Sequence, residues 1–139
     1  DVDVTAFGYE IGQLPANPAA YTPHPMLVDA AKAGIASLED IQTLVGQITT
    51  GDTFMTKDDD IAKARANFPD MAAVEMEGAA IAQTCHQFKV PFVVIRSMSD
   101  IAGKESPTSF EAYLETASVN SSKMVMTMLD ALKNKKLDA

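Results

Sequence analysis

The chain has 139 residues, of which 47% are apolar and 22% are charged. This length fits one domain with a real core, and the composition excludes a disordered chain, a collagen-like repeat and a disulfide scaffold. Eleven lysines and arginines against 19 aspartates and glutamates give a net charge of −8, which argues against general nucleic-acid binding because it repels phosphate backbones.

The first half of the chain predicts a loop, a helix, a strand and a second helix, in that order. Residues 8–25 are rich in proline and glycine and predict a loop. Gln42–Thr50 is β-branched and apolar and predicts a strand, and Thr56 is the expected N-cap of a helix that continues to about Asn67. The helix between loop and strand begins at Pro25, and its apolar face comprises Leu27, Ala30, Ala31, Gly34, Ile35 and Leu38.

The second half continues the alternation. Met71–Met76 predicts a short strand and Gly78–Phe88 an alanine-rich helix, while the apolar run Pro91–Met98 is typical of a strand covered on both faces. Alternating strands and helices predict an α/β fold with a parallel sheet and right-handed crossovers. Residues 106–133 predict a long amphipathic helix, whose expected inner stripe comprises Phe110, Tyr113, Leu114, Ala117, Met124, Met128 and Leu132.

Each predicted strand is followed by residues suited to binding a ligand. Phe54 follows the first strand, Glu77 the second and Asp100 the third, and successive members are 23 residues apart. Ligands of open α/β sheets bind beyond the carboxyl ends of the strands. The sequence therefore predicts a site where these three segments converge.

Each of these residues also has a structural interpretation, which the pattern leaves open. Glu77 could complement the positive end of a helix dipole, Asp100 could cap a turn, and Phe54 could pack in the core. The acidic run Asp58–Asp60 is interpreted as a solvated first helical turn, so we expect no metal. Arg96 lies inside an apolar run and is expected to form a structural ion pair.

The remaining reactive residue types predict no chemistry. His24 and His86 have no nucleophile partner that the sequence identifies. Cys85 is the only cysteine, so no intrachain disulfide can form, which is typical of cytoplasmic proteins. The longest strongly apolar run, Val90–Ile95, is too short to cross a bilayer, so we expect no membrane partner.

At these same segments the chain resembles the nucleosidases that cleave methylthioadenosine and S-adenosylhomocysteine, members of the purine nucleoside phosphorylase superfamily. The specific motifs are Val74-Glu75-Met76-Glu77 and Ser99-Asp100, and the match extends over the whole chain. The matching stretches also include residues 3–10, 12–15, 51–54, 78–82 and 90–96. The resemblance implies a single domain, residues 1–139, of three-layer α/β/α architecture with a mixed, mostly parallel central sheet.

The resemblance also implies an activity: hydrolysis of the N-glycosidic bond, which releases adenine and a thioribose in methionine salvage, with no cofactor. Asp100 would protonate adenine N7, which requires a pKa raised by partial burial, and Ser99 would orient it. Glu77 would hold the ribose hydroxyls near the developing positive charge, while Glu75 is interpreted as structural.

Further residues are implied to bind the substrate. Phe54 would stack on adenine, the Met55 backbone would read the base edge, Met76 would pack on the ribose, and Phe110 would line the alkylthio pocket. The family is dimeric, and a loop from one subunit would close the pocket of its neighbour. The residues of this loop are Val4, Phe7, Tyr9 and Pro15.

The resemblance corresponds to only the C-terminal portion of a typical family member. The family's first strands, with the acid that activates water and a glycine-rich loop near the ribose, would precede Asp1. We therefore expect residues 1–139 alone to be unstable or aggregated and inactive, because a sheet of three strands leaves an edge uncovered.

Two other functions stay open. A purine nucleoside phosphorylase would use phosphate in place of water, and the length of the match over Thr5–Pro15 favours the nucleosidase. The chain could also be a non-catalytic module that binds an adenine nucleoside or mediates dimerisation. Adenine release with and without phosphate separates the two enzymes.

Overall fold

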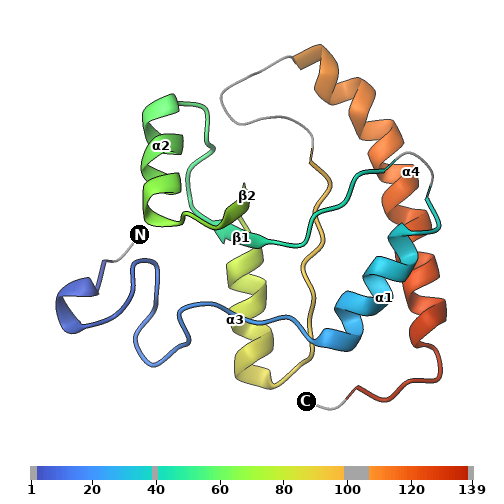
Figure 1. Cartoon of the computed structure of the whole chain (residues 1–139), viewed down its shortest axis with the longest axis horizontal. Helices are drawn as coiled ribbons and strands as arrows, with labels where there is room; N and C mark the ends of the chain where they lie inside the picture. Colours follow the sequence, from blue (N-terminus) through green and yellow to red (C-terminus); the bar gives the residue numbers. More distant parts are fainter. Residues whose placement is uncertain (1–2, 39–40, 99–106, 138–139) are drawn as a thin grey trace. The chain divides into compact units, whose positions relative to one another are not determined.

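The computed structural model describes residues 3–38, 41–98 and 107–137, and the side chains of all of these except 107–112. The chain divides into two compact units. The first contains the described residues up to Thr22 together with Val45–Phe88, and the second contains Pro23–Leu44 and the described residues from Lys89 onward. The elements, in chain order, are the 3-10 helix η1 (Thr5–Phe7), α1 (Pro25–Ile35), β1 (Gln47–Thr50), α2 (Asp58–Asn67), β2 (Met71–Glu75), α3 (Gly78–Phe88) and α4 (Pro107–Leu132) (Figure 1).

The first unit is built on two parallel strands. β1 pairs with β2, with Ile48 opposite Ala73 and Thr50 opposite Glu75. Parallel neighbours need a crossover connection, and here α2 lies in that connection. The helix α3 contacts β1, and its Ala82 is buried. Strand, helix and parallel strand confirm the α/β class that the sequence predicts.

The bounds of α3 match the prediction at both ends. Its first residue, Gly78, is buried, and the chain leaves the helix at Lys89, which adopts a left-handed conformation with φ of 53°. A left-handed residue after the last helical residue is a common way for a helix to end.

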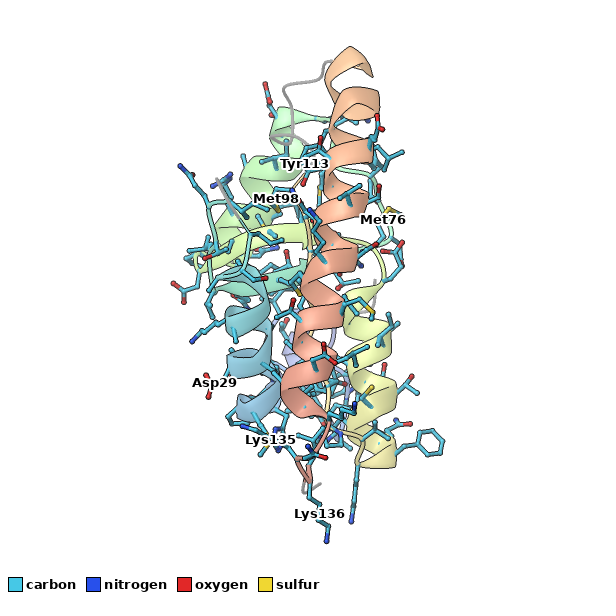
Figure 2. All side chains as sticks on the ribbon, turned by 90° about the vertical axis from the view of Figure 1, so that its right-hand side faces the viewer. Asp29, Met76, Met98, Tyr113, Lys135 and Lys136 are labelled. Atoms are coloured by element: carbon cyan, nitrogen blue, oxygen red, sulfur yellow. The ribbon has the colours of Figure 1, made fainter. Side chains whose placement is uncertain are left out.

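The second unit is organised around the contact between α1 and α4. Leu27, Ala30 and Ala31 of α1 form a core with Met128 of α4, and Val93 and Ile95 pack against this core. The exposed Asp29 points away from α4, as the amphipathic pattern requires (Figure 2).

The predicted strand Pro91–Met98 is wrong: no ladder hydrogen bonds assign residues 91–98 to a strand. One of its carbonyls, that of Phe92, accepts a hydrogen bond from the His24 amide at 2.8 Å, in the loop before α1. Val93 and Ile95 are partly buried against the helices of the second unit. Two residues of the apolar run thus pack against helices without joining a strand, and periodicity alone does not distinguish the two environments.

Several predicted boundaries also need correction, among them the end of the second strand, which is Glu75 instead of Met76. The first strand begins at Gln47 instead of Gln42, because only four residues find partners on β2, and residues 41–46 are exposed. The N-cap of α2 is Lys57 instead of Thr56, and no side chain caps this helix. The helix α1 ends at Ile35, so Leu38 lies beyond it.

The inner stripe of α4 is only partly as expected. Met124 and Met128 are buried, whereas Leu114 is 54% exposed and lies outside the stripe. The side chain of Phe110 lies outside the described residues. Across the described part of the chain, no helix combines the length and apolar character needed to cross a bilayer.

Candidate functional site

Two of the three predicted site segments meet at one edge of the sheet. The last residue of β1, Thr50, lies opposite the last residue of β2, Glu75, and the Gly51 amide donates to the Glu75 carbonyl at 3.0 Å. Because the strands are parallel, Phe54 and Glu77 follow strand ends that lie side by side (Figure 1). The predicted convergence of these two segments is confirmed. The third, Ser99 and Asp100, lies outside the described residues.

The Glu75 carboxylate is bound at the N-terminus of α3. It accepts hydrogen bonds from the amides of Glu77 (3.0 Å) and Gly78 (2.7 and 2.9 Å). The first amides of a helix have no intrahelical partners, and a carboxylate there also complements the helix dipole. Glu75 therefore fills the helix-terminus role that the sequence alone left open for Glu77.

The residues expected to touch the substrate are largely accessible. Phe54 is 67% exposed, so its interpretation as a core residue is wrong. Met76 is 42% exposed, Glu77 is exposed, and Met55 is half-buried. This edge of the sheet offers an aromatic face, a thioether and a carboxylate. Aromatic rings stack on the flat faces of bases, and carboxylates accept hydrogen bonds from hydroxyls, so the edge suits a ligand with an aromatic base and a hydroxylated sugar.

The N-terminal loop of the first unit is ordered by short-range hydrogen bonds. The Asp3 carboxylate accepts a hydrogen bond from the Thr5 amide at 2.9 Å. This backbone bond is the main reason why the pKa of Asp3 is lowered, and a hydrogen bond from the Thr5 side chain adds to the effect. The predicted dimer-loop residues differ in burial: Val4 and Tyr9 are half-buried, Pro15 is exposed, and Phe7 is 81% exposed.

The histidines have structural partners. His24 Nδ1 accepts from the Met26 amide at 3.2 Å and so caps α1. The His86 ring lies 5.4 Å from that of Tyr21, and burial raises the pKa of Tyr21. Within the described residues, no group of three or more His, Cys, Asp or Glu side chains could hold a metal ion.

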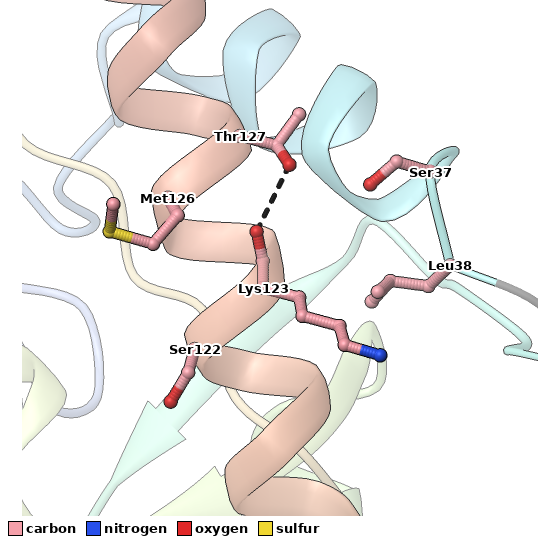
Figure 3. Close-up of a pocket in the computed structure, with 6 residues that line it drawn as sticks. All are labelled: Ser37, Leu38, Ser122, Lys123, Met126 and Thr127. Atoms are coloured by element: carbon pink, nitrogen blue, oxygen red, sulfur yellow. Dashed lines mark hydrogen bonds between the residues drawn. The ribbon is translucent and has the colours of Figure 1, made fainter.

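The second unit has a hollow of about 450 Å³ beside α1 and α4 (Figure 3). The Thr127 hydroxyl at its wall donates to the Lys123 carbonyl at 3.0 Å. None of the predicted site residues lines this hollow; its walls come from Ser37, Leu38, Ser122, Lys123, Met126 and Thr127.

One residue of the sheet edge, Thr50, has a role that its local sequence does not predict. The Thr50 hydroxyl donates to the Glu75 carboxylate and accepts from the Ala79 amide at 2.8 Å. A hydroxyl residue at the end of a strand is the only sequence signal for this role, because the partners are 25 and 29 residues away.

Fold and sheet edge together define a class of protein. Residues 1–132 match the model of the phosphorylase superfamily, and the chain belongs to this superfamily. Among curated relatives, the chain is similar to the 5'-methylthioadenosine/S-adenosylhomocysteine nucleosidase of Colwellia psychrerythraea, with 71% identity over 100% of this chain and 59% of the relative.

The chain is also similar to solved structures of nucleosidases of this kind. The Colwellia psychrerythraea nucleosidase in complex with adenine is 72% identical, with a TM-score of 0.90, over 99% of this chain and 57% of that chain. The Neisseria meningitidis nucleosidase in complex with methylthio-immucillin-A is 46% identical, with a TM-score of 0.86, over 95% of this chain and 57% of that chain. The chain thus spans less than two thirds of the length of the relatives that it matches.

Proposed function

We propose that this chain forms the adenine- and ribose-binding part of a nucleosidase that hydrolyses 5'-methylthioadenosine and S-adenosylhomocysteine. The products are adenine and a 5-thioribose derivative, as in methionine salvage. The observation that carries the proposal is 71% identity to such a nucleosidase along the entire chain. The parallel strand ends support it, because they bring Phe54 and Glu77 to one edge of the sheet.

The reaction breaks the bond between ribose C1' and the adenine nitrogen. The electron pair of this bond leaves with adenine, and a proton reaches the base. The oxygen of water bonds to C1' and the water loses one proton, so the uptake and release of protons balance. Asp100 supplies the proton to adenine N7, and Ser99 orients Asp100. Glu77 binds the ribose hydroxyls and stabilises the positive charge that develops on the sugar.

The other proposed contacts divide between the two ends of the substrate. Phe54 stacks on adenine and the Met55 backbone meets the base edge, while Met76 packs on the ribose. The exposure of Phe54 and Met76 supports these roles, since a side chain that binds a ligand must be accessible to it. Phe110 lines the pocket of the alkylthio group.

We further propose that the two compact units belong to one domain, and that the protein is a cytoplasmic homodimer. The superfamily match is continuous across both units, which supports a single domain. The 81% exposure of Phe7 supports the dimer, because a large aromatic side chain in solvent can bury its area on a neighbouring subunit. The loop with Val4, Tyr9 and Pro15 then closes the neighbour's pocket.

The test is an assay of adenine release from methylthioadenosine by the natural full-length chain, with and without inorganic phosphate. The proposal predicts release at the same rate in both conditions. Release that depends on phosphate would make the protein a phosphorylase. Binding of methylthioadenosine without any adenine release would make it a non-catalytic nucleoside-binding module.

A further inference from the structure

Three consecutive backbone amides at the start of α3 are bound by two side chains from the strand ends. Glu75 accepts from the amides of Glu77 and Gly78, and Thr50 accepts from the amide of Ala79. The Thr50 hydroxyl also donates a hydrogen bond to the Glu75 carboxylate. A hydroxyl has one donor and two acceptor sites, so both bonds of Thr50 can form together. The two side chains therefore form one connected unit, here called the Thr50–Glu75 pair.

Gly78 allows the carboxylate to lie this close to the helix. A Cβ at position 78 would be 2.8 Å from Glu75 Oε1 and 3.1 Å from Glu75 Cδ. Any larger side chain would push the carboxylate away from the amides. Hydrogen bonds to an ionised acceptor are stronger than those between neutral groups, which favours this arrangement.

The hydrogen bonds of the Thr50–Glu75 pair flank the short segment that contains Glu77, the residue proposed to bind the ribose. Met76 and Glu77 are the only residues between the end of β2 and the start of α3. The Glu75 backbone is held by the Gly51 amide, and its side chain holds the amide of Glu77 itself. The backbone of this two-residue segment is thus fixed from the strand side and from the helix side.

We propose that Glu75 and Thr50 are positioning residues for Glu77: they hold its backbone in the orientation from which its carboxylate binds the ribose. This inference rests on the proposed nucleosidase function. Neither residue needs to touch the substrate. Their effect on the reaction comes through the geometry of Glu77, and a displacement of about 1 Å in a catalytic group can cost about 10²-fold in rate.

The experiment uses matched variants of Thr50 in the natural full-length chain. Thr50→Val keeps the shape but removes the hydroxyl, and Thr50→Ser keeps the hydroxyl. Thr49→Val is the control, because the Thr49 hydroxyl donates to the Ala73 carbonyl at 3.3 Å within the sheet. We expect Thr50→Val to lower kcat for adenine release by roughly 10- to 100-fold, whereas Thr50→Ser and Thr49→Val stay close to the parent.

The same substitution in a Glu77→Gln background separates positioning from a general structural role. Residues that act through one another are not additive. We expect Thr50→Val to have little further effect on kcat once Glu77 is changed. A general loss of structure would give the same fold-reduction in both backgrounds. The amide proton resonances of Glu77, Gly78 and Ala79 report directly on the hydrogen bonds, and we expect the Ala79 resonance to shift in Thr50→Val only.

The outcomes are distinguishable. A parent that releases no adenine contradicts the proposed function, and this inference with it. An active parent in which Thr50→Val equals Thr50→Ser in kcat contradicts the inference alone, as does an equal loss in both backgrounds. Glu75→Gln provides a second variant, because it keeps the side-chain length but replaces one acceptor oxygen with an amide nitrogen. It should reproduce the kcat loss of Thr50→Val.

Discussion

Glu75 and Glu77 are two residues apart and have different surroundings. The Glu75 carboxylate is half-buried against the amides of α3 and the Thr50 hydroxyl, whereas Glu77 is exposed beside Met76. A carboxylate that accepts from the first amides of a helix complements the helix dipole, and a carboxylate on an exposed residue can also accept from ligand hydroxyls. The different burial of these two acids is consistent with the different roles proposed for them above.

Glu77→Gln should lower kcat by roughly 10²-fold or more, in the range seen when one electrostatic stabiliser of a transition state is removed. The amide keeps the size of the side chain but loses the negative charge that, in the proposed reaction, stabilises the positive charge developing on the ribose. Steady-state kinetics of adenine release test this. Unchanged substrate binding together with unchanged turnover would assign Glu77 to a purely structural role.

Asp100→Asn should preserve the fold and abolish detectable adenine release, because an amide cannot deliver a proton to the base. Loss of a general acid costs roughly 10²- to 10⁴-fold in rate. Far-ultraviolet circular dichroism monitors the fold while adenine release is followed by chromatography. A variant that retains more than about a tenth of the parent rate would rule out Asp100 as the acid.

The Asp3 carboxyl should titrate below the ordinary range for an aspartate, since hydrogen bonds from Thr5 lower its pKa. A lowered pKa means that the charged form stabilises the N-terminal turn. This contribution is present above the pKa of the unfolded chain and is lost as the pH falls through the lower pKa of the folded chain. An NMR titration of Asp3 in folded and urea-unfolded protein measures both midpoints. Equal midpoints would contradict the structure of this turn.

At the scale of elements, the crossing of α1 and α4 depends on one small residue. A Cβ on Gly34 would lie 2.7 Å from the backbone carbonyl of Met124, which cannot move aside like a flexible side chain. Replacing Gly34 would therefore force the two helices apart. The close approach explains why a glycine stands on the buried face of a helix, where its intrinsic propensity is poor.

Gly34→Ala should destabilise the protein although alanine is the better helix former. Overpacking costs about 1–3 kcal/mol and the gain in propensity returns about 1 kcal/mol, so we expect a net loss of about 1 kcal/mol in the free energy of unfolding. Gly51→Ala is the control, because a Cβ there would meet nothing within 4 Å. Urea unfolding of both variants measures the difference. A Gly34→Ala variant at least as stable as the parent would mean that the helices do not cross this closely.

Local pattern predicted the helices better than the strands. The bounds of α3 follow from an alanine-rich run between Gly78 and Lys89, and α1 follows from its apolar spacing. The pairing of β1 depends on β2, 24 residues further on, so its bounds are not encoded locally. The run 91–98 is as apolar as a buried strand, but Val93 and Ile95 pack against the helices of the second unit and no strand forms.

For the site, the rule that ligands bind beyond parallel strand ends correctly predicted that the segments carrying Phe54 and Glu77 follow adjacent strand ends. It could not identify the Thr50–Glu75 pair, because the sequence does not show which of two nearby acids turns toward the helix. That choice depends on Gly78, where the missing Cβ leaves room for the Glu75 carboxylate.

At the scale of the whole molecule, the superfamily match establishes the family of the chain but leaves open which nucleophile attacks the sugar. The superfamily match covers residues 1–132 and therefore both compact units. The phosphorylases and hydrolases of such a superfamily share a fold, and a fold alone does not specify whether water or phosphate attacks the sugar. The central claim is therefore a claim about the nucleophile.

Incubation of the natural full-length chain with methylthioadenosine in H₂¹⁸O, followed by mass spectrometry of the sugar product, tests this claim most directly. Hydrolysis breaks the glycosidic bond and places an oxygen from water on C1'. We predict free adenine together with a methylthioribose that carries one ¹⁸O, also when phosphate is present. A sugar 1-phosphate that carries no ¹⁸O from the solvent would contradict the account.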